Sequence, residues 1–172
     1  AYAHLGLREG SFPVAEQINI QNQADLADWP CFSKYYLTIP LSPVPAGKVI
    51  LNATLTVNLF GGSDPSAAQD SLIQVFSVAE DWAPTGLTWN NAPLAMENLS
   101  RTWVEPTTFP GWPGIPYTWD VSRAVAQAYA SGEPLRIAMY SADGAIHSGK
   151  YFYASDADVA GRPTLQITWG NP

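Results

Sequence analysis

Aromatic side chains in loops are the residues of this chain best suited to hold a ligand. Trp29, Trp103, Trp112 and Tyr117 lie in or beside segments rich in proline, glycine and polar residues. A loop aromatic can present a flat apolar face to the C–H face of a pyranose, so that a sugar is bound without charge. Trp112, flanked by glycine and proline, is the best candidate for such a platform, and Trp29 is the second. Packing of the loops onto the body of the protein is the alternative role for these rings.

Side chains for catalysis are scarce. The two histidines, His4 and His147, do not lie in a nucleophile-elbow setting, so a Ser–His–acid hydrolase is not indicated. The carboxylates Glu80 and Asp81 are adjacent in a turn, whereas the acid and base of a glycosidase face each other from separate segments. The chain has no Cys/His set with zinc spacing and no glycine-rich phosphate loop. These features favour a binding or structural protein over an enzyme.

Two further kinds of site are suggested by short patterns. Asp156 and Asp158 alternate in a turn and could supply oxygen ligands to a structural Ca²⁺, or could simply be solvated carboxylates. No other cofactor is indicated. Asn52 and Asn98 each begin an acceptor pattern for N-glycosylation, which requires a host able to use it. The alternating pattern places Asn52 on the polar face of a strand, and Asn98 is expected on a loop.

Composition sets the class of the protein and excludes several partners. The chain has 172 residues, enough for one domain spanning residues 1–172, and carries 13% charged and 12% aromatic residues with 13 Gly and 15 Pro. Its net charge of −7, without a Lys/Arg cluster, excludes nucleic acid and anionic membrane surfaces as partners. No apolar run approaches the ~20 residues that span a bilayer. The single cysteine, Cys31, is expected to be a buried thiol.

The elements that must position these side chains are mostly strands. Short apolar and β-branched runs bounded by turn residues predict about nine strands at even spacing, which is typical of an all-β, two-sheet β-sandwich of jelly-roll type. The clearest strand alternates Leu51, Ala53, Leu55, Val57 and Leu59 with polar residues, so it should be buried on one side. The expected strands are Ala3–Leu7, Gln17–Gln21, Lys34–Leu41, Val49–Phe60, Leu72–Val78, Arg101–Glu105, Leu135–Tyr140, Lys150–Ala154 and Thr164–Trp169.

One helix, Val121 to Ala130, is expected to cover the sandwich. Its apolar residues recur at helical spacing and are mostly alanine and valine, so it must lie close to a flat surface. Asp120 stands at the expected N-cap position, and Gly132 at the expected left-handed position after the last turn. Ala124 and Ala128 should face the sheet, which leaves Arg123 toward solvent.

Nine short segments follow one another along the chain as motifs, namely Leu5–Gly10, Tyr36–Ile39, Val44–Gly47, Ala53–Val57, Leu87–Pro93, Trp119–Ser122, Ser131–Gly132, Tyr151–Ser155 and Arg162–Ile167. In this order they resemble the DNRLRE, or disaggregatase-related, domain, a secreted β-sandwich grouped with carbohydrate-binding modules. The resemblance covers nearly the whole chain, and its tryptophans Trp82, Trp89 and Trp119 are expected to pack in the core and at corners. One position departs from the family pattern, because Tyr35 stands where a basic residue is expected, so binding of acidic sugars is not carried over.

The resemblance implies a non-catalytic, extracellular carbohydrate-binding module that recognises a polysaccharide through loop aromatics. A different class remains as the alternative, namely a structural subunit of a filament or surface layer on the cell surface that binds copies of itself. In that case the segment Ala1 to Leu7 would pair with the sheet edge of a neighbour, an interaction that needs no distinctive side chains. The start at Ala1, without Met or a signal-like segment, fits a mature secreted product or an excised module.

Overall fold

The computed structural model describes residues 2–4, 16–22, 32–62, 68–78, 80–142 and 149–172, and these contain ten β-strands and one α-helix. The helix is α1, Ser122–Ser131. The strands are β1 (Tyr2–His4), β2 (Gln17–Asn22), β3 (Phe32–Ile39), β4 (Val49–Gly62), β5 (Ser71–Val78), β6 (Ala95–Val104), β7 (Ile115–Asp120), β8 (Leu135–Ser141), β9 (Lys150–Tyr153) and β10 (Thr164–Gly170).

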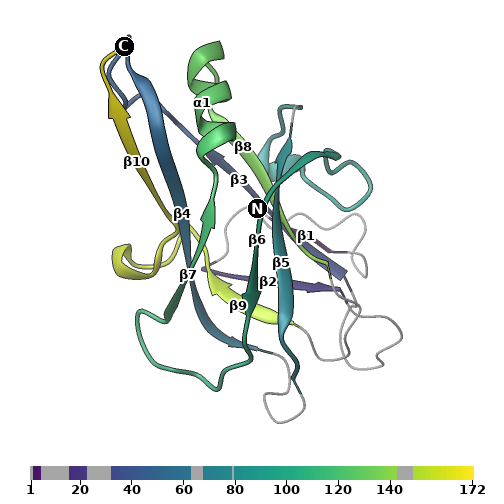
Figure 1. Cartoon of the computed structure of the whole chain (residues 1–172). Coiled ribbons are helices and arrows are strands. Elements are labelled where there is room, and N and C mark those ends of the chain that lie inside the picture. Colours follow the sequence, from purple (N-terminus) through teal and green to yellow (C-terminus); the bar gives the residue numbers. More distant parts are fainter. Residues whose placement is uncertain (1, 5–15, 23–31, 63–67, 79, 143–148) are drawn as a thin grey trace.

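The strands are antiparallel and fold into two facing layers (Figure 1). In one layer, β10 and β9 pair with successive lengths of one edge of β4, β7 pairs with the other edge, and β2 pairs with β9. The other has the order β3-β8-β5-β6, with β1 also paired to β3. Strand β2 connects the layers, because it pairs with β9 along Gln17–Ile20 and with β3 at Gln21 and Asn22. The two-sheet β-sandwich expected from the sequence is confirmed.

The core lies between the layers and follows the alternation of β4. Ala53, Leu55, Val57 and Leu59 are fully buried in one cluster with residues of β5 and β8. Trp119 of β7 belongs to the same cluster, and its indole Nε1–H donates to the carbonyl oxygen of Ile73 on β5 at 2.9 Å. Because this bond joins the layers inside the core, the packing role predicted for Trp119 is confirmed.

The largest differences from the predicted strands are an additional strand, β7, and an earlier start of β6. Strand β7 was not expected, because Pro116 lacks the N–H that a central strand needs; β7 pairs with β4 alone, and a proline is tolerated on such an edge. Strand β6 begins at Ala95 rather than Arg101, which places Asn98 on a strand and not on the expected loop. Because this exposed edge strand contains many polar residues, it does not form an apolar run that would be recognised in the sequence.

The buried face predicted for β4 is wrong at Leu51, whose side chain is 63% exposed. The register with β10 passes from Thr168↔Asn52 to Trp169↔Ile50, so Leu51 is the extra residue of a β-bulge. A bulge reverses the alternation beyond it, and Ile50 instead packs against the core.

Helix α1 covers one end of the sandwich, between β4 and β8 and near the C-terminus (Figure 1). Ala124 and Val125 are buried and Ala128 packs against the core, as predicted. The N-cap is Val121, so the prediction of Asp120 there is wrong by one residue. Asp120 nonetheless accepts hydrogen bonds from the backbone N–H and hydroxyl of Ser122 at 2.9 and 2.5 Å. Gly132 adopts the predicted left-handed conformation, with φ of 75°.

The N-terminal strand, β1, pairs with strand β3 of the same chain. Tyr2, Ala3 and His4 pair with Tyr35, Lys34 and Ser33 of β3.

Helix α1 has ten residues. None of the helices among the described residues has the length and apolar character needed to cross a membrane.

Candidate functional site

Five aromatic side chains gather on the outer surface of the β4–β9 layer, and we refer to them as the aromatic patch. Phe60 stacks on Tyr153 with ring centroids 4.6 Å apart and on Phe109 at 6.3 Å. The ring centroids of Tyr151 and Phe60 are 6.1 Å apart. Trp112 contacts Tyr153 edge to face, with ring centroids 4.8 Å apart. The patch is therefore continuous through Phe60 and Tyr153.

The strands supply the base of the patch through their alternation. Leu59 and Phe152 pair with each other and point into the core, so Tyr151 and Tyr153 on either side of Phe152 point outward. The register shifts between Leu59 and Gly61, which leaves Phe60 without a partner directly opposite. Its ring lies on the outer surface between the two tyrosines.

The connection between β6 and β7 supplies the two outer rings, and glycines give them room. A Cβ added to Gly61 would lie 2.8 Å from Cε1 of Phe109, and one added to Gly161 would lie 2.6 Å from Cη2 of Trp112. Both rings therefore rest directly on glycine backbone. Trp112 stands in a tight turn in which the N–H of Gly114 donates to the carbonyl oxygen of Gly111 at 2.9 Å.

The glycine under Trp112 is held to strand β4. The Asn58 side chain is buried, and its Nδ2 donates to the carbonyl oxygen of Gly161 at 3.1 Å. This bond fixes the 3₁₀ turn Val159–Gly161 against the sheet. The support of the indole is thus tied to the same strand that carries Phe60.

Exposure distinguishes the outer rings from their base. Phe109 is 72% exposed and Trp112 is 49% exposed, whereas Phe60 is buried beneath them. Exposed rings held by packing on one side offer apolar faces at low conformational cost. Such an arrangement can stack on a planar or pyranose ring.

The structure separates the ligand residues predicted from the sequence. Trp112 is in the patch. Tyr117 pairs with Val57 and so faces inward, where its hydroxyl accepts the N–H of Glu105 at 3.2 Å. Burial raises the pKa of this tyrosine. Trp103 pairs with Leu72 on the other layer and is 58% exposed there, and Trp29 lies outside the described residues.

Sequence reasoning missed Phe60, Phe109, Tyr151 and Tyr153 as partners of Trp112. The segment Tyr151–Tyr153 carries aromatic residues at three successive positions, and a strand must place its outer two on one face. That signal was available in the sequence. The pairing of this segment with the end of β4 was not.

The metal and glycosylation candidates are not among the residues of the aromatic patch. Asp156 and Asp158 are both exposed in the turn after β9. Within the ranges that the structure describes, no three His, Cys, Asp or Glu side chains gather as a metal site would require. Asn52 and Asn98 are exposed on β4 and β6. The Ca²⁺ site and the two glycosylation sites remain predictions.

A second group of aromatic residues covers the outer face of the other layer. Trp82 and Trp89 pack with Leu87 against Tyr36, as expected of corner residues. The Lys34 ammonium lies 4.2 Å from the centroid of the Trp89 ring and 4.4 Å from that of Tyr140. Burial lowers the pKa of Lys34 below its ordinary 10.5. These ring faces already hold a cation, so they are less suited to stack on a sugar.

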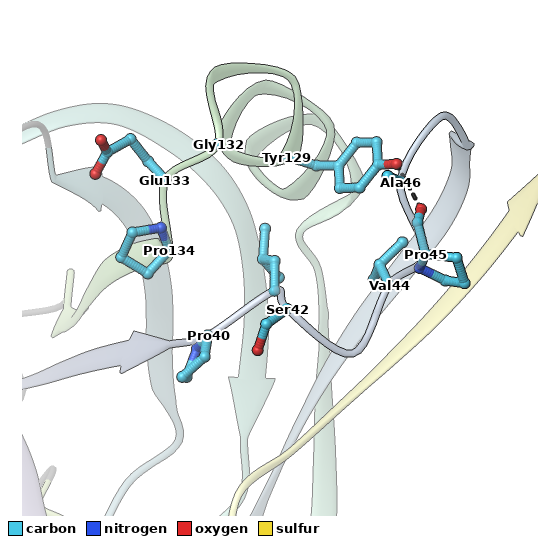
Figure 2. A pocket seen from close by; sticks show the side chains of 10 residues that line it. Pro40, Ser42, Val44, Pro45, Ala46, Tyr129, Gly132, Glu133 and Pro134 are labelled. Carbon is cyan, nitrogen blue, oxygen red and sulfur yellow. Dashed lines mark hydrogen bonds between the residues drawn. The ribbon is translucent and has the colours of Figure 1, made fainter.

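A groove of about 520 Å³ lies between the C-terminal turn of α1 and the loop that leads into β4 (Figure 2). The Tyr129 hydroxyl on its wall donates to the carbonyl oxygen of Pro45 at 2.7 Å and accepts the N–H of Lys48 at 2.9 Å. Glu133 on the rim is 3.1 Å from Arg136. The Tyr129 hydroxyl and the Glu133 carboxylate of the groove are thus engaged within the protein, and the aromatic patch is the better candidate site. The lining residues are Pro40, Leu41, Ser42, Val44, Pro45, Ala46, Tyr129, Gly132, Glu133 and Pro134.

Comparison with protein families identifies the chain. The family model described as carbohydrate-binding module family 96 matches residues 9–169. The chain belongs to this family. The match confirms the resemblance to carbohydrate-binding modules, whereas the DNRLRE name itself stays a prediction. A search of the curated proteins finds no match. In this family 96 module, the matched region includes every residue of the aromatic patch.

Proposed function

We propose that this protein is a non-catalytic, extracellular module that binds a neutral polysaccharide through the aromatic patch, with Trp112 as the principal stacking residue. The observation that carries the proposal is the seating of two exposed rings, Phe109 and Trp112, directly on glycine backbone. Membership of a carbohydrate-binding family supports the ligand class.

The charge of the molecule favours a neutral over an acidic polymer. The chain carries 8 Lys and Arg against 15 Asp and Glu, and the patch contains only aromatic residues. A uronate polymer would approach a protein of net charge −7 without a basic group among the patch side chains. Stacking on the C–H face of a sugar requires no charged group and is compatible with the net negative charge of the protein.

The test is binding of the purified protein to a panel of neutral polymers (cellulose, xylan, mannan and chitin) and acidic ones (alginate and pectate), by pull-down and affinity electrophoresis. Trp112→Ala should weaken the binding to a retained polymer by ~1–3 kcal/mol, as the loss of aromatic stacking does for other planar ligands. Trp103→Ala is the matched control, because Trp103 is a similarly exposed tryptophan on the opposite layer.

Three results would overturn the proposal. Retention by none of the six polymers would remove the function. Binding to the acidic polymers alone would remove the neutral ligand class. Loss of binding in Trp103→Ala with full binding in Trp112→Ala would move the site to the other layer.

A further inference from the structure

The outer face of strands β10, β4 and β7 carries an exposed polar surface that the aromatic patch does not explain. Two in-register sets of residues cross the three strands. Thr164, Thr56 and Thr118 form one row, and Gln166, Thr54 and Asp120 form the next. Thr168 and Asn52 continue the surface on two strands. We call these eight residues the polar platform.

The side chains of the platform must point away from the core. Their neighbours along each strand are core residues, namely Ala53, Leu55 and Val57 on β4 and Trp119 on β7. Directly opposed residues of an antiparallel pair lie on one face with Cβ atoms about 5 Å apart, so each row is a ladder of adjacent side chains. Thr54 and Thr56 are half-buried and the other six are exposed.

The platform adjoins the aromatic patch at the turn Val159–Gly161, which covers the outer face of β4 beyond Thr56. Asn58 follows Thr56 on the same face of β4, and its amide holds the carbonyl of Gly161 on which Trp112 rests. Phe60 is the next outward residue. From Asn52 to Asn58, over which this turn carries Trp112, strand β4 covers roughly 20 Å at about 3.3 Å per residue. This length accommodates several sugar rings in an extended chain.

The chemistry of the platform suits sugar hydroxyls. Threonine hydroxyls and asparagine and glutamine amides can both donate and accept hydrogen bonds. Asp120 is the one charged member, and its Oδ1 already accepts two hydrogen bonds from Ser122. Arg162, which precedes β10, is directed to its own loop, where Nε donates to the carbonyl oxygen of Ala157 at 2.6 Å.

We propose that the polar platform extends the binding site, so that a neutral polysaccharide chain stacks on Trp112 and continues across β4, β7 and β10. The proposal rests on the function proposed above and adds a second set of ligand residues to it. Short fragments should occupy the aromatic patch alone. Longer fragments should bind more tightly because they also reach the ladder Thr164–Thr56–Thr118.

The experiment compares a disaccharide and a hexasaccharide cut from whichever neutral polymer of the panel is retained, by isothermal titration calorimetry. The wild-type protein should bind the hexasaccharide more tightly. The double variant Thr56→Val/Thr164→Val keeps two β-branched residues but removes both hydroxyls. It should lose about tenfold in affinity for the hexasaccharide, the effect expected when a small number of hydrogen bonds are lost, and nothing for the disaccharide.

The matched control is Thr38→Val, since Thr38 is exposed on the other layer. It should leave both affinities unchanged, and Trp112→Ala should reduce both. Equal wild-type affinity for the two fragments, or an unchanged hexasaccharide affinity in the double variant, would overturn the platform while leaving the role of Trp112 intact. Retention of no neutral polymer would overturn both proposals.

Discussion

The indole of Trp112 lies against the backbone of Gly161, where a Cβ atom would come within 2.6 Å of Cη2 and 2.8 Å of Cζ3. The same Cβ would lie 3.1 Å from Cδ2 of Tyr153. The position of the exposed ring therefore depends on the absence of a side chain beneath it. Phe109 on Gly61 repeats this relationship at the other side of the patch.

Gly161→Ala should displace the Trp112 ring and weaken polysaccharide binding toward the level of Trp112→Ala. Because the ring is half exposed and can move outward, the free energy of unfolding should fall by only about 1 kcal/mol, the low end for overpacking. Affinity electrophoresis and urea denaturation measure the two effects. Gly86→Ala is the control, since nothing lies within 4 Å of a Cβ there. Full binding by Gly161→Ala would show that ring position is unimportant.

Ala124→Leu should lower the free energy of unfolding by roughly 1–3 kcal/mol, because the added carbons overfill the contact between α1 and the core. Arg123→Ala should cost at most about 1 kcal/mol. The Arg123 side chain is 70% exposed, although Nη1 lies 2.7 Å from the Glu97 carboxylate. Thermal melts rank the two variants. The reverse order would contradict the placement of the helix.

Asp120→Ala should destabilise the protein by about 1 kcal/mol at neutral pH, because the N–H and hydroxyl of Ser122 lose their acceptor. The two hydrogen bonds from Ser122 hold the pKa of Asp120 below its ordinary 3.8. With a lowered pKa in the folded state, this contribution is complete above pH 3.8 and is lost as the pH falls through the lower value.

This role of the Asp120 carboxylate is tested by measuring the stability of the protein by circular dichroism at a series of falling pH values. Wild type should lose stability more steeply below about pH 4 than Asp120→Asn, which keeps an acceptor oxygen but does not titrate. If the two proteins lost stability equally steeply as the pH falls below about 4, the charge of the Asp120 carboxylate would contribute nothing to stability.

Tyr36→Phe should make the protein less sensitive to alkali. Burial and the hydrogen bond with Tyr140 raise the pKa of Tyr36 well above its ordinary 10. Above pH 10 the folded state then keeps a proton that the unfolded chain releases, so stability falls as the pH rises. Removing the hydroxyl removes this dependence.

The measurement is urea unfolding between pH 8 and pH 11. At pH 8 the variant should lose about 1 kcal/mol, because the bond from the Tyr36 hydroxyl to the carbonyl oxygen of Pro93 at 3.3 Å is gone. The deficit should shrink as the pH rises. Tyr35 and Tyr117, whose pKa values are also raised by burial, contribute to the alkaline sensitivity that remains. A deficit that stays constant with pH would contradict the titration of Tyr36.

Local patterns in the sequence were sufficient for much of the architecture. The alternation from Ala53 to Leu59, the helical spacing around Ala124 and the glycine at position 132 each depend on neighbouring residues alone. Such short-range rules fail where pairing with a distant strand decides the outcome. The bulge at Leu51 is set by the register with β10, and the strand at Pro116 exists because its one partner is β4.

The aromatic patch divides in the same way. The loop position of Trp112 and the shared face of Tyr151 and Tyr153 follow from a local loop pattern and from the alternation of a strand, and the sequence by itself determined both. Only the tertiary structure decided that Phe60 lies between the tyrosines, that Gly161 supports Trp112, and that Tyr117 faces inward. These three facts arise from pairings of β4 with β9 and β7 and from the packing of two loops on its outer face. The physical reason is that contacts between distant segments depend on strand register, which the local pattern of side chains does not encode.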